Sequence, residues 1–260
     1  MKKKIINILI LCLFIFTAGC GKKQEKIDLL DKVMQRGKLI VGVKFDTKPF
    51  GFINDKQELA GYDIDLAKYI AKALLGDENK IEFKQVTSSN RILALNSGQI
   101  DMIIATMTIT PQRAKIINFS NPYYIAGQTI LVPKDSKVTS MTDLNGKKVI
   151  IIFGSTSEKT LRLIAPNADI IGFKTYTSGY SALKQGRADA MTTDDTILMG
   201  FAMADKSFKM LPKRYTQEPY GIGFIKDESS ERLKSRVNAI IEDMKRNGEL
   251  KIIRNKWISY

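Results

Sequence analysis

Histidine is absent from this sequence of 260 residues. Its absence removes the usual general base, the Ser-His-Asp and Cys-His catalytic arrangements, and every zinc site that depends on imidazole ligands. Both cysteines, Cys12 and Cys20, lie within the first twenty residues, so the rest of the chain has no thiol chemistry. Disulfide frameworks, CxxC redox motifs and iron–sulfur clusters are therefore excluded. We expect neither a metal nor a cofactor.

Acidic residues are few compared with basic ones, since 27 Asp and Glu stand against 41 Lys and Arg, a net charge of +14. Such a balance can indicate a nucleic-acid or membrane partner. The basic residues are interleaved with acids, as in residues 242–246, and no RNP-like aromatic strand, helix-turn-helix pattern or zinc finger accompanies them. A lysine-rich solvated surface accounts for the charge, and we expect no nucleic-acid binding.

A single long apolar run, residues 5–16, follows three lysines near the N-terminus. This is the plan of a secretory signal peptide, and the run is shorter than the ~20 residues that span a bilayer. It ends in the sequence Thr-Ala-Gly-Cys at 17–20, which resembles a bacterial lipobox. We expect a lipoprotein signal peptide over 1–19 and an extracytoplasmic protein anchored to the bacterial membrane by a lipid on Cys20. An uncleaved hydrophobic anchor is the alternative, and it leads to the same side of the membrane.

The body of the chain repeats one βαβ rhythm twice. Short apolar runs predict strands, and apolar positions at helical spacing predict the helices between them. Such an order favours an α/β fold of two similar lobes with a ligand cleft between them, at the carboxyl ends of the strands. We expect a tether over 20–36 that leads into a short helix, lobe 1 over 38–125 and 222–260, lobe 2 over 128–217, and chain crossings near 125–128 and 217–222. The strands are predicted at 38–44, 81–86, 100–105, 147–152, 170–173, 188–191 and 221–225, and the helices at 61–76, 90–97, 157–165, 178–185, 229–246 and 249–258.

The first of three informative loops contains Arg113. Thr110 can cap the next helix with Pro111 at its first position, which places Arg113 in the first helical turn. A guanidinium there is disfavoured by ~0.3–1 kcal/mol, unless an anion lies between it and the free backbone N–H groups. The alternative is a surface arginine with neighbours along the helix.

The other two loops lie in the second half of the chain. Residues 153–158 run from a strand through Gly154 to a hydroxyl-capped helix, whose N–H groups suit a carboxylate or phosphate. No Walker A motif is formed, because no Gly-Lys-Ser/Thr follows. In the third loop Asp194 and Asp195 end a strand, and one carboxylate facing the cleft would pair with an ammonium group. The alternative is that the two carboxylates bind a metal or act as the catalytic acids of a glycosidase, but no third metal ligand or partner acid is evident. A cation in one lobe and an anion in the other suit a zwitterionic α-amino acid.

Five motifs resemble, in order, those of the extracellular solute-binding proteins of polar amino-acid ABC importers. They are GYDIDL at 61–66, TITPQR at 108–113, FSNPYY at 119–124, GST at 154–156 and KW at 256–257. The resemblance covers residues 36–260 and implies a type II periplasmic-binding-protein fold that closes on its ligand, a permease partner, a monomer, and no catalysis.

By that resemblance, Arg113 clamps the ligand α-carboxylate with the N–H groups of Thr108 and Thr156. Asp194 pairs with the α-ammonium, together with the Thr106 carbonyl and the Thr108 hydroxyl. The remaining expected ligand-binding residues are Ser155, Thr193, Phe50, Arg91 and Lys44.

Specificity depends on Arg91 and Lys44. The stretch 86–92 is similar to that of glutamate- and aspartate-binding members, whose arginine binds the distal carboxylate, and Lys44 stands at a position that is basic in those members. Two cations favour an acidic side chain through charge-assisted hydrogen bonds. We therefore expect L-glutamate or L-aspartate as the ligand; the alternative for both residues is a surface position or a structural ion pair.

Other functions remain open from the sequence. Glutamine or another polar amino acid such as cystine is the alternative ligand. A dehydratase on the same fold, with Glu158 as its acid, is the enzymatic alternative, and a ligand sensor for a signalling partner is the third.

Overall fold

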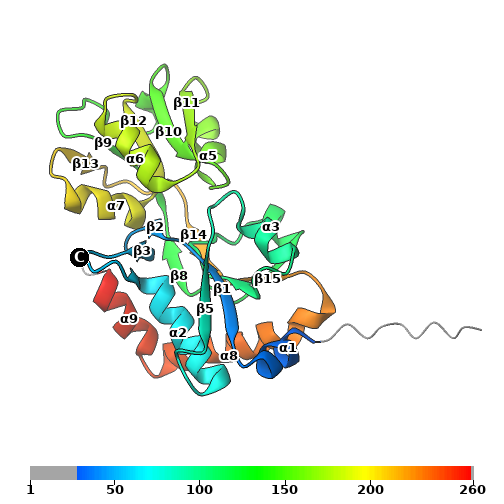
Figure 1. Ribbon diagram of the computed structural model, residues 1–260. Helices are drawn as coiled ribbons and strands as arrows, with labels where there is room; N and C mark the ends of the chain where they lie inside the picture. Colours follow the sequence, from blue (N-terminus) through cyan, green and yellow to red (C-terminus); the bar gives the residue numbers. More distant parts are fainter. Residues whose placement is uncertain (1–27, 259–260) are drawn as a thin grey trace, which may run out of the picture.

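The structure is a computed structural model that describes residues 28–258 (Figure 1). The expected signal peptide, Cys20 and the first part of the expected tether lie outside the described residues, so cleavage and lipidation stay predictions. Figure 1 shows two α/β lobes, one above the other, joined by extended segments. The predicted fold class is therefore observed.

Lobe 1 is built on a five-stranded sheet. Strand β1 lies between two parallel neighbours, and β15 runs antiparallel to the two strands beside it. Alternate residues of β1 are fully buried because helices cover the sheet. Across the sheet the strands are β5 (Ile81–Gln85), β1 (Leu39–Val43), β6 (Met102–Ile103), β15 (Gly223–Ile225) and β7 (Ile117–Phe119). The helices are α1 (Leu29–Arg36), α2 (Tyr62–Leu75), α3 (Arg91–Asn96), α4 (Pro111–Ala114), α8 (Glu231–Arg246) and α9 (Glu249–Trp257), and a small sheet contains β2 (Asp46–Thr47), β3 (Gly51–Ile53) and β4 (Leu59–Ala60).

Lobe 2 repeats this plan with a five-stranded sheet in which β10, next to the edge strand β11, also has two parallel neighbours. Two antiparallel strands complete it, and one of them, β9, is almost entirely buried. The strands in order are β11 (Asp169–Phe173), β10 (Lys148–Ile152), β12 (Ala190–Asp194), β9 (Gln128–Pro133) and β13 (Phe208–Met210), and the helices are α5 (Ser157–Ile164), α6 (Tyr176–Lys184) and α7 (Asp195–Ala204).

The chain passes between the lobes twice, through β8 (Tyr124–Ala126) and β14 (Glu218–Tyr220), which pair with each other in antiparallel register. A paired crossing is stiffer than two separate loops because its backbone groups bond to each other. These strands lie between the two sheets in Figure 1 and hold the lobes face to face.

The expected tether ends in a short helix, α1, as the sequence predicts. The Asp28 carboxylate caps α1 by accepting from the N–H of Leu30, and Val33 is fully buried in the lobe 1 core. Arg232 of α8 pairs with Asp31 of α1. Helix α1 therefore packs on lobe 1. Within residues 28–258, none of the helices combines the length and apolar character needed to cross a membrane.

Candidate functional site

Most of the expected site residues follow strands of the two lobes and lie where the lobes meet. In lobe 1, Lys44 follows β1, Thr106 and Thr108 follow β6, and Arg91 begins α3. In lobe 2, Thr156 follows β10 and Asp194 ends β12. Because the parallel strands of each sheet point the same way, their carboxyl ends bring these loops to one edge. The two edges face each other across the junction in Figure 1.

Arg113 spans the cleft. Its backbone N–H donates to the Thr110 hydroxyl at 3.2 Å, with Pro111 at the first helical position, as the sequence predicts. Its Nη1 donates to the Thr108 carbonyl of lobe 1 and its Nη2 to the Gly154 carbonyl of lobe 2, both at 2.8 Å. Burial lowers the pKa of Arg113, while the nearby carboxylates of Glu218 and Asp194 raise it. The guanidinium is thus half-buried and held on two sides.

The backbone of Thr108 presents its polar groups to this arginine. Thr108 faces Tyr220 in an isolated antiparallel bridge, whose hydrogen bonds come from the flanking residues Ile109 and Gly221. In such a pair the central residue directs its N–H and C=O away from the partner strand. The Thr108 carbonyl accepts from Arg113 on that outer edge, so the N–H of Thr108 points to the same side.

Asp194 is the acidic group of lobe 2 in the cleft. It is 5% exposed, and its Oδ2 accepts a hydrogen bond of 2.5 Å from the Tyr220 hydroxyl. Its Oδ1 is buried and has no hydrogen-bond partner among the described residues. Burial first, and then the charge of Glu218, raises the pKa of Asp194 to about 7. A buried acceptor without a partner is costly, and an ammonium donor would remove that cost.

Arg91 is buried against main-chain carbonyls. It is 2% exposed, and its Nη1 donates to the carbonyls of Ala105 and Thr106, whereas its Nε has no partner within the described part of the chain. Burial, followed by the charge of Arg113, lowers the pKa of Arg91 to about 9. The alternative of a surface arginine is therefore wrong.

Lys44 lies beside Arg91 in the same buried region and is 1% exposed. Its Nζ donates to the Ser88 hydroxyl at 2.7 Å and lies 5.4 Å from the centroid of the Tyr176 ring. Burial, followed by the charge of Arg91, lowers the pKa of Lys44 well below its usual value. Across residues 28–258, neither Lys44 nor Arg91 forms an ion pair with a carboxylate. Both are buried cations in the cleft.

The loop at 154–156 approaches lobe 1 closely. Gly154 has φ +80°, and a β-carbon there would lie 2.5 Å from the Ser88 carbonyl oxygen, so only glycine fits. The Ser155 hydroxyl accepts from the N–H of Ser157 at the start of α5. The Thr156 hydroxyl donates to Glu218 and accepts from the Gln128 side chain. The loop is fixed by both lobes.

Three more expected residues lie deeper in the structure. The N–H of Thr106 donates to the buried Asp63 carboxylate, and the Thr106 hydroxyl has no partner among the described residues. The Thr193 hydroxyl is buried and lies 3.4 Å from the Tyr176 hydroxyl. Phe50 is fully buried, and its ring packs edge-on against those of Tyr62, Tyr124 and Tyr220. Phe50 thus belongs to an aromatic core under the cleft.

Sequence reasoning missed four residues of this cluster: Tyr176, Tyr220, Gln128 and Glu218. None belongs to a glycine-rich loop or an acidic pair, so no local pattern marks them. Tyr220 and Glu218 lie on β14, within the crossing expected at 217–222, and that position is the one signal that pointed to them.

Two chemical alternatives do not fit the geometry. Asp195 bonds to the N–H of Gly127 and pairs with Arg214, and no group of three His, Cys, Asp or Glu suited to a metal occurs among the described residues. Glu158, the candidate acid of a dehydratase, is partly exposed on α5 and pairs with Arg162 one turn later. The carboxylate is thus held by a neighbour on its own helix and not by the residues that surround Arg113 and Asp194.

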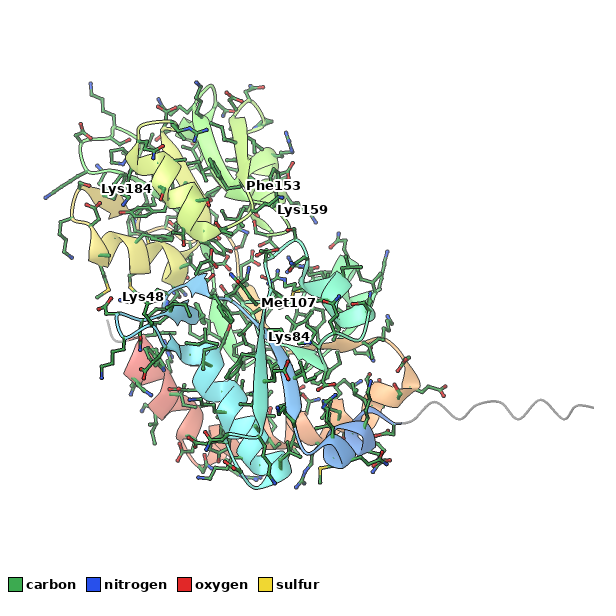
Figure 2. All side chains as sticks on the ribbon, viewed as in Figure 1. Lys48, Lys84, Met107, Phe153, Lys159 and Lys184 are labelled. Carbon is green, nitrogen blue, oxygen red and sulfur yellow. The ribbon has the colours of Figure 1, made fainter. Side chains whose placement is uncertain are left out.

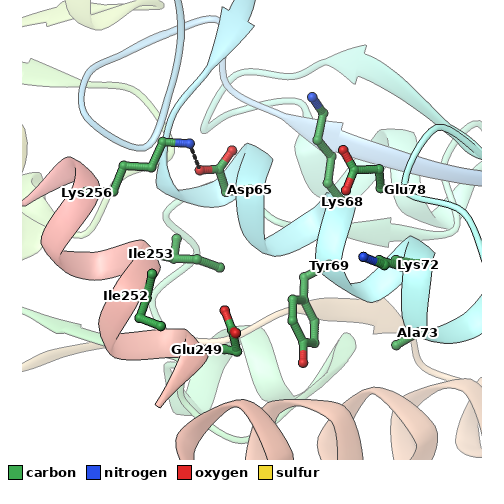
Figure 3. A pocket seen from close by; sticks show the side chains of 10 residues that line it. All are labelled: Asp65, Lys68, Tyr69, Lys72, Ala73, Glu78, Glu249, Ile252, Ile253 and Lys256. Atoms are coloured by element: carbon green, nitrogen blue, oxygen red, sulfur yellow. Dashed lines mark hydrogen bonds and ion pairs between the residues drawn. The ribbon is translucent and has the colours of Figure 1, made fainter. Parts of the chain in front are cut away.

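Cavities occur both at the cleft and elsewhere. A groove of about 510 Å³ opens at the mouth of the cleft and is lined by residues that include Arg113, Gly154 and Thr156. A larger hollow of about 750 Å³ lies between α2 and α9 on lobe 1, where Lys256 pairs with Asp65 (Figure 3). The hollow in Figure 3 contains none of the expected site residues.

Residues 39–260 match the family model for bacterial extracellular solute-binding proteins, family 3. The chain belongs to this family. The match covers far more than half of the sequence and includes both lobes. The family is one of solute-binding proteins, not catalytic ones, which confirms the expectation that this chain performs no reaction on its ligand.

Named relatives support this assignment over nearly the whole length. The ABC transporter glutamine-binding protein GlnH of Bacillus subtilis is 43% identical, over 98% of this chain and 97% of its own. The glutamine-binding protein of Geobacillus stearothermophilus is 49% identical over 76% of each chain. The glutamate-binding protein GluB of Corynebacterium efficiens is 31% identical over 88% of this chain and 81% of its own.

Solved structures show the same architecture. A cysteine-binding protein from Campylobacter jejuni superposes with a TM-score of 0.85 and is 32% identical, covering 90% of this chain and 94% of its own. An ancestral arginine-binding protein bound to glutamine has a TM-score of 0.80 and is 39% identical, covering 86% and 99%. This extracellular solute-binding protein therefore has the two-lobed fold expected from its sequence.

Proposed function

We propose that this protein is the amino-acid-binding component of an ABC importer and that its preferred ligand is L-glutamine. The observation that carries the proposal is that the cleft contains both a cation and an anion. Arg113 spans the cleft, and the buried Oδ1 of Asp194 lacks a partner among the described residues. A guanidinium binds a carboxylate, and a buried carboxylate binds an ammonium group. Together they fit the two charged ends that all α-amino acids share.

The side-chain preference follows from the charges around the cleft. Three basic residues, Lys44, Arg91 and Arg113, stand beside an equal number of acids, Asp63, Asp194 and Glu218, and these three acids are buried. A zwitterion with a neutral side chain leaves this balance unchanged, whereas glutamate adds one negative charge. Burial also lowers the pKa of Lys44, which weakens the positive charge that an acidic side chain would need beside it.

This proposal revises the expected preference for an acidic ligand. That expectation assumed that a neutral ligand would leave Arg91 and Lys44 unpaired. Arg91 already donates to two main-chain carbonyls, and Lys44 donates to Ser88, so a neutral amide causes no such loss. Two relatives named for glutamine are 43% and 49% identical, whereas two relatives named for glutamate are each 31% identical.

The remaining parts of the proposal concern location and partners. A lipid on Cys20 would hold the protein at the outer face of the membrane, next to the permease that takes up the released ligand. Closure of the lobes on the amino acid would present one combined surface to that permease, and the protein acts as a monomer.

Calorimetric titration of the protein, unfolded and refolded to remove any bound ligand, tests the proposal with L-glutamine, L-glutamate, L-aspartate and L-cystine. We expect a dissociation constant for L-glutamine near 1 μM, about −8 kcal/mol, and at least tenfold weaker binding of L-glutamate. Tighter binding of L-glutamate would restore the acidic assignment. Failure of every amino acid to bind would overturn the function itself.

A further inference from the structure

Lobe 1 touches lobe 2 at a second place, formed by residues 46–48 of lobe 1 and the helices α6 and α7 of lobe 2. We name it the rim contact. None of the ligand-binding residues expected from the sequence belongs to it, and Lys48 marks its position at the junction of the lobes in Figure 2. Figure 2 also shows Phe153 and Lys159 on the opposite side of the junction, so the rim contact and the loop at 154–156 flank the cleft.

The first half of the rim contact is a hydrogen bond between the lobes. The Asp46 carboxylate accepts from the backbone N–H of Tyr176 at 2.8 Å, and Tyr176 is the first residue of α6. The first N–H groups of a helix have no partner within the helix, and a negative charge near them is favourable. Asp46 of lobe 1 thus completes the start of a helix of lobe 2.

The second half is a close backbone approach. Gly200 lies inside α7, where glycine costs about 1 kcal/mol relative to alanine. A β-carbon on Gly200 would lie 2.8 Å from the carbonyl oxygen of Lys48, closer than real β-carbons come to a backbone oxygen. The unfavourable glycine is therefore explained by the contact between the lobes, which any side chain at this position would obstruct.

We propose that Asp46 and Gly200 are positioning residues that stabilise the closed arrangement of the lobes and thereby set ligand affinity without touching the ligand. The inference rests on the proposed function, because its main readout is amino-acid binding. If only a fraction of the protein has its lobes closed, the measured affinity is reduced by that fraction. Weakening the rim contact lowers the fraction of closed protein, and so lowers the affinity for every ligand by the same factor.

Gly200→Ala is the decisive variant because two effects of the added methyl group have opposite signs. Alanine strengthens α7, so the melting temperature of the ligand-free protein stays equal or rises. The same methyl group pushes the Lys48 carbonyl away, so we expect affinities for L-glutamine and L-glutamate to fall equally, by about three- to tenfold. Ser235→Ala, an exposed helix substitution in α8, serves as the control and leaves affinity unchanged. Unchanged affinity in Gly200→Ala would overturn the role of Gly200.

Asp46→Asn tests the hydrogen bond, with Asp55→Asn, an exposed acid at the β3–β4 turn, as the control of equal charge change. We expect affinity to fall about fivefold for both ligands in the first variant and to stay unchanged in the second. The negative charge of Asp46 also raises the pKa of Lys44, which lies in the cleft. An effect through Lys44 would change the ratio of glutamine to glutamate affinity, and such a change would overturn the positioning role.

Hydrogen exchange separates a failure of this inference from a failure of the proposed function. If the wild-type protein binds no amino acid, the function is wrong, and exchange of the Tyr176 amide still reports on the rim contact. We then expect at least tenfold faster exchange at Tyr176 in Asp46→Ala than in the wild type. Equal exchange rates would overturn the rim contact independently of any ligand.

Discussion

In lobe 1 the strands follow the order β5-β1-β6-β15-β7, and in lobe 2 they follow β11-β10-β12-β9-β13, with the same succession of parallel and antiparallel pairs. In each lobe the second strand of this order, β1 or β10, shares a five-residue parallel register with the edge strand beside it. The scaffolds correspond strand by strand, yet they deliver different chemistry to the cleft.

Lobe 1 supplies three cations, Lys44, Arg91 and Arg113, whereas lobe 2 supplies Asp194 and the start of α5 at Thr156. The difference lies in the loops that follow equivalent strands, since strand order and packing are shared. A rigid repeated framework thus positions loops whose residues can differ freely. The opposition of charge across the cleft is what suits the molecule to a zwitterion.

The largest effect is expected from the cationic side of this comparison. In the proposed binding mode Arg113 is the one charged residue that contacts the ligand α-carboxylate, and Arg113→Ala removes it. Every amino acid should bind at least 100-fold more weakly, a loss of about 3 kcal/mol, as measured by calorimetric titration. Arg232→Ala, which removes an exposed arginine paired with Asp31, is the matched control and should bind normally. Retained binding in Arg113→Ala would disprove the assigned clamp.

The anionic side is tested by pH. The pKa of Asp194 is about 7 in the ligand-free protein, above its usual value of 3.8, so its ionisation lowers stability as pH rises from ~4 to ~7. A ligand ammonium group favours the ionised carboxylate. Affinity should therefore fall by up to tenfold per pH unit below about 7 and level off above it.

In Asp194→Asn this dependence should shrink, affinity at pH 8 should drop by about 30-fold, and the ligand-free protein should melt at a higher temperature at pH 8. Asp63, with a pKa that burial also raises to about 7, is unchanged in that variant, so the difference between the two profiles reports Asp194. Asp135→Asn, at an exposed acid of lobe 2, should leave both profiles as they are. Identical profiles for wild type and Asp194→Asn would show that another group binds the ammonium.

The approach of the two lobes is tested at Gly154. In Gly154→Ala the new methyl group would meet the Ser88 carbonyl, so affinity for L-glutamine and L-glutamate should fall equally, by about tenfold or more. Gly146→Ala is a close control in the same lobe, because Gly146 also has a positive φ, +74°, but open space around it. Both variants lose about 1 kcal/mol of stability from backbone strain, and only the first should lose affinity.

The smallest effect concerns selectivity. Lys44→Gln keeps a donor for Ser88 but removes the capacity for positive charge. Affinity for L-glutamine should change by less than fivefold, while that for L-glutamate should fall further, so their ratio rises about threefold. Lys38→Gln, at an exposed lysine, controls for net charge. A falling ratio in competition titrations would mean that Lys44 does not favour the acidic ligand.

Much of the fold was predictable because it depends on local patterns. The short apolar run of β1, the helical spacing in α2 and the Thr110-Pro111 start of α4 each specify their own element. Helix α7 and strand β9 were not predicted. Helix α7 is apolar around most of its circumference, so it lacks the one-sided periodicity by which exposed helices are recognised. In β9 only residues 130–132 form an apolar run, between Thr129 and Pro133, and so short a run does not by itself predict a strand.

By itself, the sequence determined the two-lobed class, the likeness to amino-acid-binding proteins, and the loops that contain Arg113, Gly154 and Asp194, since motifs and capping residues act over a few positions. Only the tertiary structure decided that Arg91 and Lys44 are buried and already partnered, and that Tyr220 on a crossing strand holds Asp194. Burial and hydrogen-bond partners come from segments distant in the chain, and they control the charge that a side chain offers to a ligand.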